Sequence, residues 1–127
     1  MTKVGSIYQA KPFVYVIKEI VRYIDGDTID VIIDLGFSTF VKKRIRLHGI
    51  DTPETRTRDK EEKKRGLKAK KRLQELCEES TGPVTLVSHG VGKYGRVLGE
   101  LIVEPNTLVH RLMIVEGHGE EYYGGKR

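Results

Sequence analysis

Residues 13–47 read FVYVIKEIVRYIDGDTIDVIIDLGFSTFVKKRIRL, and this stretch decides the fold. Its β-branched, aromatic and alternating apolar residues favour strands in three runs: residues 13–24, 28–34 and 39–47. Two short turn signals separate the runs, Asp25-Gly26 and Leu35-Gly36. The stretch therefore predicts a three-stranded antiparallel meander.

The rest of the chain adds helices and two more strands. Residues 60–79 place apolar side chains at helical spacing, and the predicted buried face consists of Leu67, Ala69, Leu73, Leu76 and Cys77. Strands are expected at residues 84–88 and 97–103, and a second helix at 107–116, capped by Asn106. This order predicts a mainly β, α+β protein: a five-stranded OB-fold barrel with two to three packed helices.

Length and composition limit the class of protein. The chain has 127 residues with a net charge of +5, which favours one domain over residues 1–127 and a polyanionic partner such as nucleic acid. The expected core spans about residues 13–123, between a short N-terminal arm and a C-terminal tail. No apolar run is long enough to cross a membrane, and no signal-peptide pattern opens the sequence. With one cysteine, Cys77, the chain is expected to be an intracellular monomer, cytoplasmic or phage-encoded.

Acidic residues gather at two places in this basic chain. YIDGDTIDV (23–31) carries Asp25, Asp27 and Asp30, and RLHGIDTPETR (46–56) carries Asp51 and Glu54. In a meander, the start of the second strand and the end of the third lie at the same edge, so Asp27 is expected to approach Asp51. Two neighbouring carboxylates repel unless a cation bridges them or one keeps its proton. Oxygen ligands without His or Cys favour Ca²⁺ or Mg²⁺.

Each motif also has a purely structural interpretation. IDGDT alone is a common hairpin turn, and DTPE alone is a good helix start with Thr52 as N-cap. GVGKYG (90–95) matches G-x-G-x-x-G, but a strand follows it, so a dinucleotide site is excluded. This loop is instead expected to present Lys93, Tyr94 and Arg96 at the barrel surface. The charged run 56–72 is either a solvated helix face or a set of phosphate contacts.

Three motifs together carry a family resemblance. IDGDT (24–28), RLHGIDTPE (46–54) and KYGR (93–96), in this order, resemble the staphylococcal nuclease family over about residues 14–123. The resemblance implies an OB barrel and Ca²⁺-dependent hydrolysis of phosphodiester bonds in DNA and RNA, with little sequence preference. The alternative is a catalytically inactive OB-fold module that only binds nucleic acid, but binding alone does not require an acidic cluster beside phosphate.

The resemblance also implies roles for individual residues. Asp27 and Asp51 correspond to the calcium carboxylates, and Thr52 to a ligand through its main-chain carbonyl. The predicted catalytic residues are Glu54, beside the attacking water, and Arg46 and Arg96, on the scissile phosphate. The predicted substrate contacts are Lys93, Tyr94, Tyr122 and Tyr123, and which of the last two stacks near the base stays open.

Overall fold

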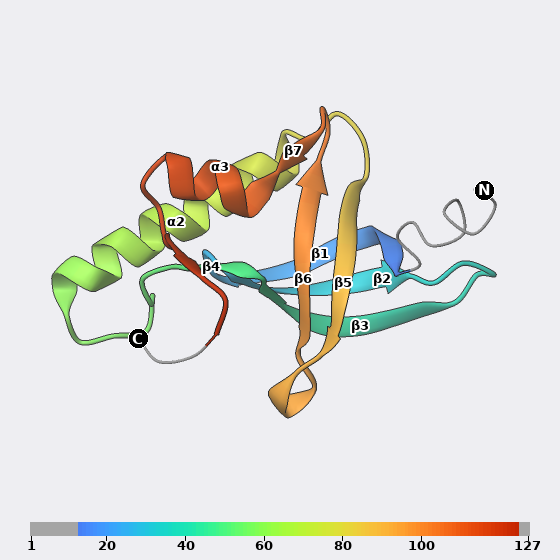
Figure 1. Cartoon of the computed structure of the whole chain (residues 1–127), viewed down its shortest axis with the longest axis horizontal. Helices are drawn as coiled ribbons and strands as arrows, with labels where there is room; N and C mark the ends of the chain where they lie inside the picture. Colours follow the sequence, from blue (N-terminus) through green and yellow to red (C-terminus); the bar gives the residue numbers. More distant parts are fainter. Residues whose placement is uncertain (1–12, 125–127) are drawn as a thin grey trace, which may run out of the picture.

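The computed structural model describes residues 13–124, so the predicted N-terminal arm and the last three residues of the tail lie outside it. Five strands form a closed mixed barrel (Figure 1): β1 (Val14–Asp25), β2 (Thr28–Asp34), β3 (Phe40–Leu47), β5 (Val84–Val91) and β6 (Val97–Val103). The antiparallel order β3-β2-β1-β5-β6 is closed by parallel pairing of β3 with β6. The predicted OB-fold class is confirmed.

Alternation along the strands fills the barrel. In β2, buried Ile29, Val31 and Ile33 alternate with partly exposed neighbours, as the sequence pattern predicts. The same register pairs Thr28 at the start of β2 with Arg46 near the end of β3. The acidic first turn and the end of the meander therefore meet at one end of the barrel.

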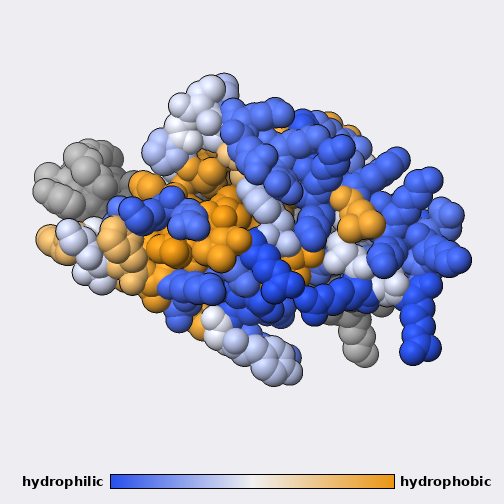
Figure 2. All heavy atoms as spheres, turned by 180° about the vertical axis from the view of Figure 1, so that it is seen from behind, coloured by the Kyte–Doolittle hydropathy of each residue, from blue (hydrophilic) through white to orange (hydrophobic). Residues whose placement is uncertain are grey.

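Helix α2 (Lys60–Glu78) packs across that end of the barrel, and its outer face belongs to the hydrophilic side of the molecule (Figure 2). It begins after Asp59, whose carboxylate accepts hydrogen bonds from the backbone N–H groups of Glu61 and Glu62. The prediction that Leu67 belongs to the buried face is wrong, because Leu67 is 47% exposed. Gly66 occupies the buried stripe instead, at helical spacing from Ala69 and Leu73.

The second helix is shorter than predicted. α3 spans Val109–Val115, and the expected cap at Asn106 is wrong, since the helix begins after Leu108 without a side-chain cap. Thr107–Leu108 forms β7, which pairs with Ile102 and Val103 of β6. Pairing with the sheet thus takes the residues that local propensity assigned to a helix.

A small second sheet lies outside the barrel. Residues 49–59 were predicted to be irregular, but β4 (Gly49–Asp51) pairs antiparallel with β8 (Glu120–Tyr122). The link between β5 and β6 contains a short 3₁₀ turn, η1 (Lys93–Gly95). None of the helices in residues 13–124 is long and apolar enough to cross a membrane.

Candidate active site

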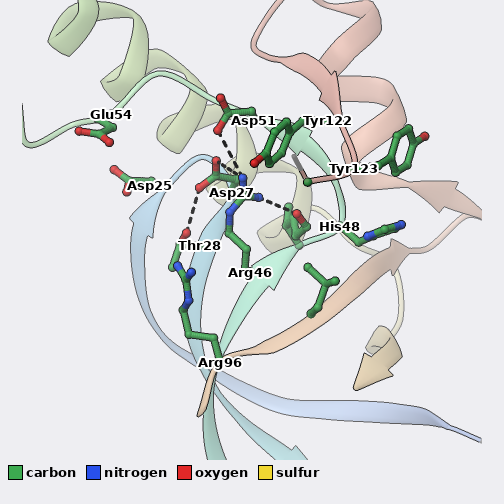
Figure 3. Close-up of a pocket in the computed structure, with 14 residues that line it drawn as sticks. Asp25, Asp27, Thr28, Arg46, His48, Asp51, Glu54, Arg96, Tyr122 and Tyr123 are labelled. Carbon is green, nitrogen blue, oxygen red and sulfur yellow. Dashed lines mark hydrogen bonds and ion pairs between the residues drawn. The ribbon is translucent and has the colours of Figure 1, made fainter. Parts of the chain in front are cut away.

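A cavity of about 370 Å³ opens where the β1–β2 turn, the β3–β4 junction and the start of β6 meet (Figure 3). Its charged lining residues come from all three places and from the loop after β4: Asp25, Asp27, Arg46, Asp51, Glu54 and Arg96. The structure therefore collects every predicted catalytic residue, and both predicted metal carboxylates, around one cavity.

Asp27 is a buried carboxylate with a fixed orientation. It is only 6% exposed, and its Oδ1 accepts a 2.9 Å hydrogen bond from the Thr28 hydroxyl. Its Oδ2 accepts a 3.0 Å hydrogen bond from the backbone N–H of Thr52. The turn can seat it here because Gly26 packs against α2, where an added Cβ would lie 2.7 Å from the Ala69 side chain. A buried carboxylate with these partners is held in place before any ligand arrives.

Arg46 bridges the two acidic segments. Its Nη1 donates to the carbonyls of Leu47 (2.6 Å) and Ile50 (2.8 Å). Its Nη2 lies 3.5 Å from Oδ2 of Asp27 and 3.3 Å from Oδ1 of Asp51. Asp27 and Asp51 thus flank a single guanidinium nitrogen, so the meander brings them together as expected.

Arg44 lies on the other face of β3, as strand alternation predicts. Its guanidinium forms a 2.8 Å ion pair with Asp30, and this hydrogen bond lowers the pKa of the Asp30 carboxyl. The two arginines therefore separate into one that faces the cavity and one that stabilises the barrel exterior.

The oxygen ligands at this site fit a hard cation. Asp27, Asp51 and the main chain of Thr52 supply oxygens only, and Thr52 is the residue whose N–H orients Asp27. No three His, Cys, Asp or Glu side chains within residues 13–124 are grouped so that they could hold a metal ion. Two carboxylates and a carbonyl leave further positions to water and substrate, a pattern that suits Ca²⁺ better than tetrahedral Zn²⁺.

The loop that carries Glu54 is fastened on both sides. The backbone N–H and the hydroxyl of Thr55 donate to Asp25 at 3.1 and 2.7 Å, and the N–H of Glu54 donates to Glu62 of α2 at 3.3 Å. The Glu54 side chain is exposed and lines the cavity. Asp25, which the sequence left as a structural or supporting residue, therefore helps to hold the segment that presents Glu54.

Gly66→Ala is expected to lower the free energy of unfolding by about 1–3 kcal/mol. A Cβ at Gly66 would lie 2.5 Å from the carbonyl oxygen of Glu54 and 2.8 Å from that of Pro53, so the loop must shift. This clash opposes the gain of about 1 kcal/mol that Ala normally brings to a helix. Urea denaturation measures the change, with Lys64→Ala on the exposed face of α2 as the control. A Gly66→Ala variant more stable than the wild type would contradict the close approach.

Arg96 directly precedes β6 and extends toward Thr28 (Figure 3). Among the described residues, its buried Nε has no hydrogen-bond partner. An arginine that lines a cavity with an unused donor is suited to bind an anion there.

The predicted substrate contacts separate into two groups. Tyr122 and Tyr123 line the cavity, and Tyr122 is positioned by its pairing with Gly49 in the β4–β8 sheet. Lys93 and Tyr94 lie in η1 and are not among the lining residues, and Tyr94 is 93% exposed with a φ of 62°. Their contact with substrate stays a prediction.

Sequence reasoning assigned no role to His48, which also lines the cavity. Its ring centroid lies 4.4 Å from that of His89 and 5.2 Å from that of Tyr123. The signal was its place between Arg46 and Asp51: a residue two positions after Arg46 tends to share its side of the sheet.

Stability is expected to fall between pH 7.5 and 5.5 because of two histidines beside the cavity. Burial lowers the pKa of His48 and of His110, whose Nδ1 is without a partner among the described residues. The unfolded chain therefore binds protons that the folded protein refuses, so stability is complete above about pH 6.5 and declines as pH falls below it. The lowered pKa values of Asp30 and Glu116 act only at more acidic pH.

Urea denaturation at both pH values measures this effect. His110→Asn should reduce the difference in unfolding free energy between the two pH values, whatever its own packing cost. An unchanged difference in His110→Asn would assign the pH dependence to other groups.

Comparisons with known proteins bear on residues 44–126, which match the family model described as staphylococcal nuclease homologue. The match includes Arg46, Asp51, Glu54 and Arg96, while Asp27 precedes it and joins the same cavity through the β1–β2 turn. A search of curated proteins gives no match. The family match covers well over half of the chain, and the barrel is of the OB type. The chain is therefore a member of the staphylococcal nuclease homologue family.

Proposed function

We propose that this protein is a Ca²⁺-dependent nuclease that hydrolyses phosphodiester bonds in DNA and RNA with little sequence specificity. The observation that carries the proposal is the placement of Arg46 against both Asp27 and Asp51, in one cavity with Glu54 and Arg96. A protein that only binds nucleic acid gains nothing from carboxylates that repel the phosphate. Together with cationic groups, the same carboxylates suit a reaction at phosphorus.

Arg46 and Arg96 bind the scissile phosphate in this proposal. Nη1 of Arg46 is fixed by two main-chain carbonyls, so its guanidinium needs little reorganisation when substrate binds. Arg96 approaches from the start of β6 with an unused Nε–H. Charge builds up on the equatorial phosphate oxygens in the transition state, and guanidinium groups already in place stabilise it.

Glu54 activates the attacking water. Its carboxylate accepts a proton while the water oxygen forms a bond to phosphorus, and the bond from phosphorus to the leaving nucleoside oxygen breaks. The Asp25 and Glu62 hydrogen bonds hold the backbone around Glu54, so its distance from the phosphate is defined before substrate arrives. A cation held by Asp27, Asp51 and the carbonyl of Thr52 would supply further charge neutralisation at the phosphate.

Charge and location complete the proposal. The net charge of +5 favours encounter with nucleic acid at low salt. Cys77, the chain's one cysteine, is buried, and burial raises the pKa of its thiol to about 11. A single unreactive thiol agrees with an intracellular setting.

The test is a cleavage assay with plasmid DNA and with RNA, in the presence of Ca²⁺, Mg²⁺ or EDTA. Cleavage of both substrates with Ca²⁺ is expected, and removal of the metal with EDTA is expected to slow it. Cleavage that EDTA does not slow would contradict the metal dependence. Binding without cleavage under every metal condition would instead identify the inactive binding module.

A further inference from the structure

Three aromatic rings form a row along one wall of the cavity: His89, His48 and Tyr123. The His48 and His89 rings lie 4.4 Å apart at an angle of 31°, and the His48 and Tyr123 rings 5.2 Å apart at 58°. Nε2 of His89 lies 2.7 Å from Oε2 of Glu100, and the N–H of His48 donates to the carbonyl of Gly99 at 2.7 Å. Strands β5 and β6 therefore fix this ring row in place.

The ring row faces the acidic side of the site. In Figure 3, Asp25 and Glu54 lie on one side of Arg46, and His48 and Tyr123 lie on the other. His48 and Tyr123 line the cavity, and the row is open at both ends, because Tyr123 is 58% exposed and the His89 side chain 36%. A nucleotide whose phosphate is held at Arg46 can direct its base only toward the wall without carboxylates.

The chemistry of His48 favours an aromatic contact over an ionic one. Burial and the neighbouring His89 lower its pKa, so the imidazole is neutral at pH 7. A neutral ring is a poor phosphate ligand but offers a flat surface for a base. Stacking of a base on an aromatic side chain is tolerant of sequence, which agrees with a nuclease of low specificity.

We propose that His48 and His89 extend the wall begun by Tyr123 into a stacking subsite for an unpaired nucleobase next to the cleaved phosphodiester bond. The inference rests on the proposed function for the position of the phosphate. It gives a role to two histidines that neither the phosphate site nor the expected metal site uses.

The experiment measures binding without cleavage. In a Glu54→Gln background, a short single-stranded DNA oligonucleotide carrying 2-aminopurine is titrated with protein, because stacking quenches the fluorescence of this base analogue. His48→Ala and His89→Ala are expected to weaken binding about fivefold or more and to reduce the quenching. His48→Phe and His89→Phe keep a ring and should restore both signals. His118→Ala, a histidine outside this cavity, is the matched control, and thermal unfolding checks that each variant is folded.

Two results would overturn the stacking subsite. The first is wild-type affinity and quenching in both alanine variants or, if those do not fold, weakened binding in the phenylalanine variants. The second is loss of binding in His48→Phe, together with wild-type affinity that rises as pH falls, which would identify a protonated imidazole on phosphate. Because His89, His110, Glu100 and Arg46 all act electrostatically on His48 or its neighbours, the pH series is repeated with His110→Asn.

The wild-type cleavage assay separates this inference from the proposed function. Absence of cleavage with intact stacking would remove the nuclease proposal alone. Cleavage with no effect of either histidine on binding would remove the subsite alone.

Discussion

Arg46→Ala is expected to lower kcat for phosphodiester cleavage by about 10³- to 10⁵-fold, the range found when an arginine that stabilises a phosphoryl-transfer transition state is removed. The loss should be large because one side chain carries out two functions. It donates to the phosphate oxygens in our proposal, and its Nη2 balances the charges of Asp27 and Asp51. Asp27 is buried, so removing its cationic neighbour also destabilises the fold.

The chain offers a matched control at Arg44. Arg44 lies two residues away on the same strand and pairs with Asp30 on the outside of the barrel. Arg44→Ala removes the same charge from the same strand and should cleave near the wild-type rate. Arg46→Lys should recover little activity, because an ammonium group cannot reproduce the fixed planar fork held by two carbonyls. Equal rates for Arg44→Ala and Arg46→Ala would mean that only overall charge matters.

Glu54→Gln is expected to lower kcat by about 10²- to 10⁴-fold, the usual contribution of a positioned general base. Glutamine has nearly the same shape and keeps the loop contacts of Thr55 and the N–H of Glu54, but it cannot take up a proton. Because the Glu54 carboxylate acts on the water, KM should change much less than kcat. Single-turnover cleavage of a labelled oligonucleotide separates the two.

Glu61→Gln serves as the control for this variant. Glu61 is an exposed glutamate in the first turn of α2, so its replacement removes a similar charge without touching the cavity. It should cleave at the wild-type rate. If Glu54→Gln retained that rate as well, another group would have to activate the water.

The meander could be predicted from sequence because its information is local. Alternation fixes which face of β2 and β3 enters the barrel, and a slip by one residue would expose the buried Ile29 and Ile45. The short turn at Gly26 then leaves one register, which pairs Thr28 with Arg46. The approach of Asp27, Arg46 and Asp51 follows from these two facts.

The parts that were missed depend on distant partners. Residues 49–51 become a strand only because residues 120–122 pair with them, and no local pattern announces this. Thr107 and Leu108 leave the predicted helix because β6 offers hydrogen bonds. The ring row joins His48 and His89 across a separation of 41 positions, and its geometry requires the barrel to be closed.

The parallel pairing of β3 with β6 has a consequence for a cell that makes this protein. Arg46 and Arg96 come from strands on either side of that seam, and the cavity is finished by Tyr122, close to the end of the chain. An emerging polypeptide on the ribosome therefore lacks a complete cutting centre until nearly all of it has been synthesised. A nuclease built in this way leaves its own messenger intact during translation.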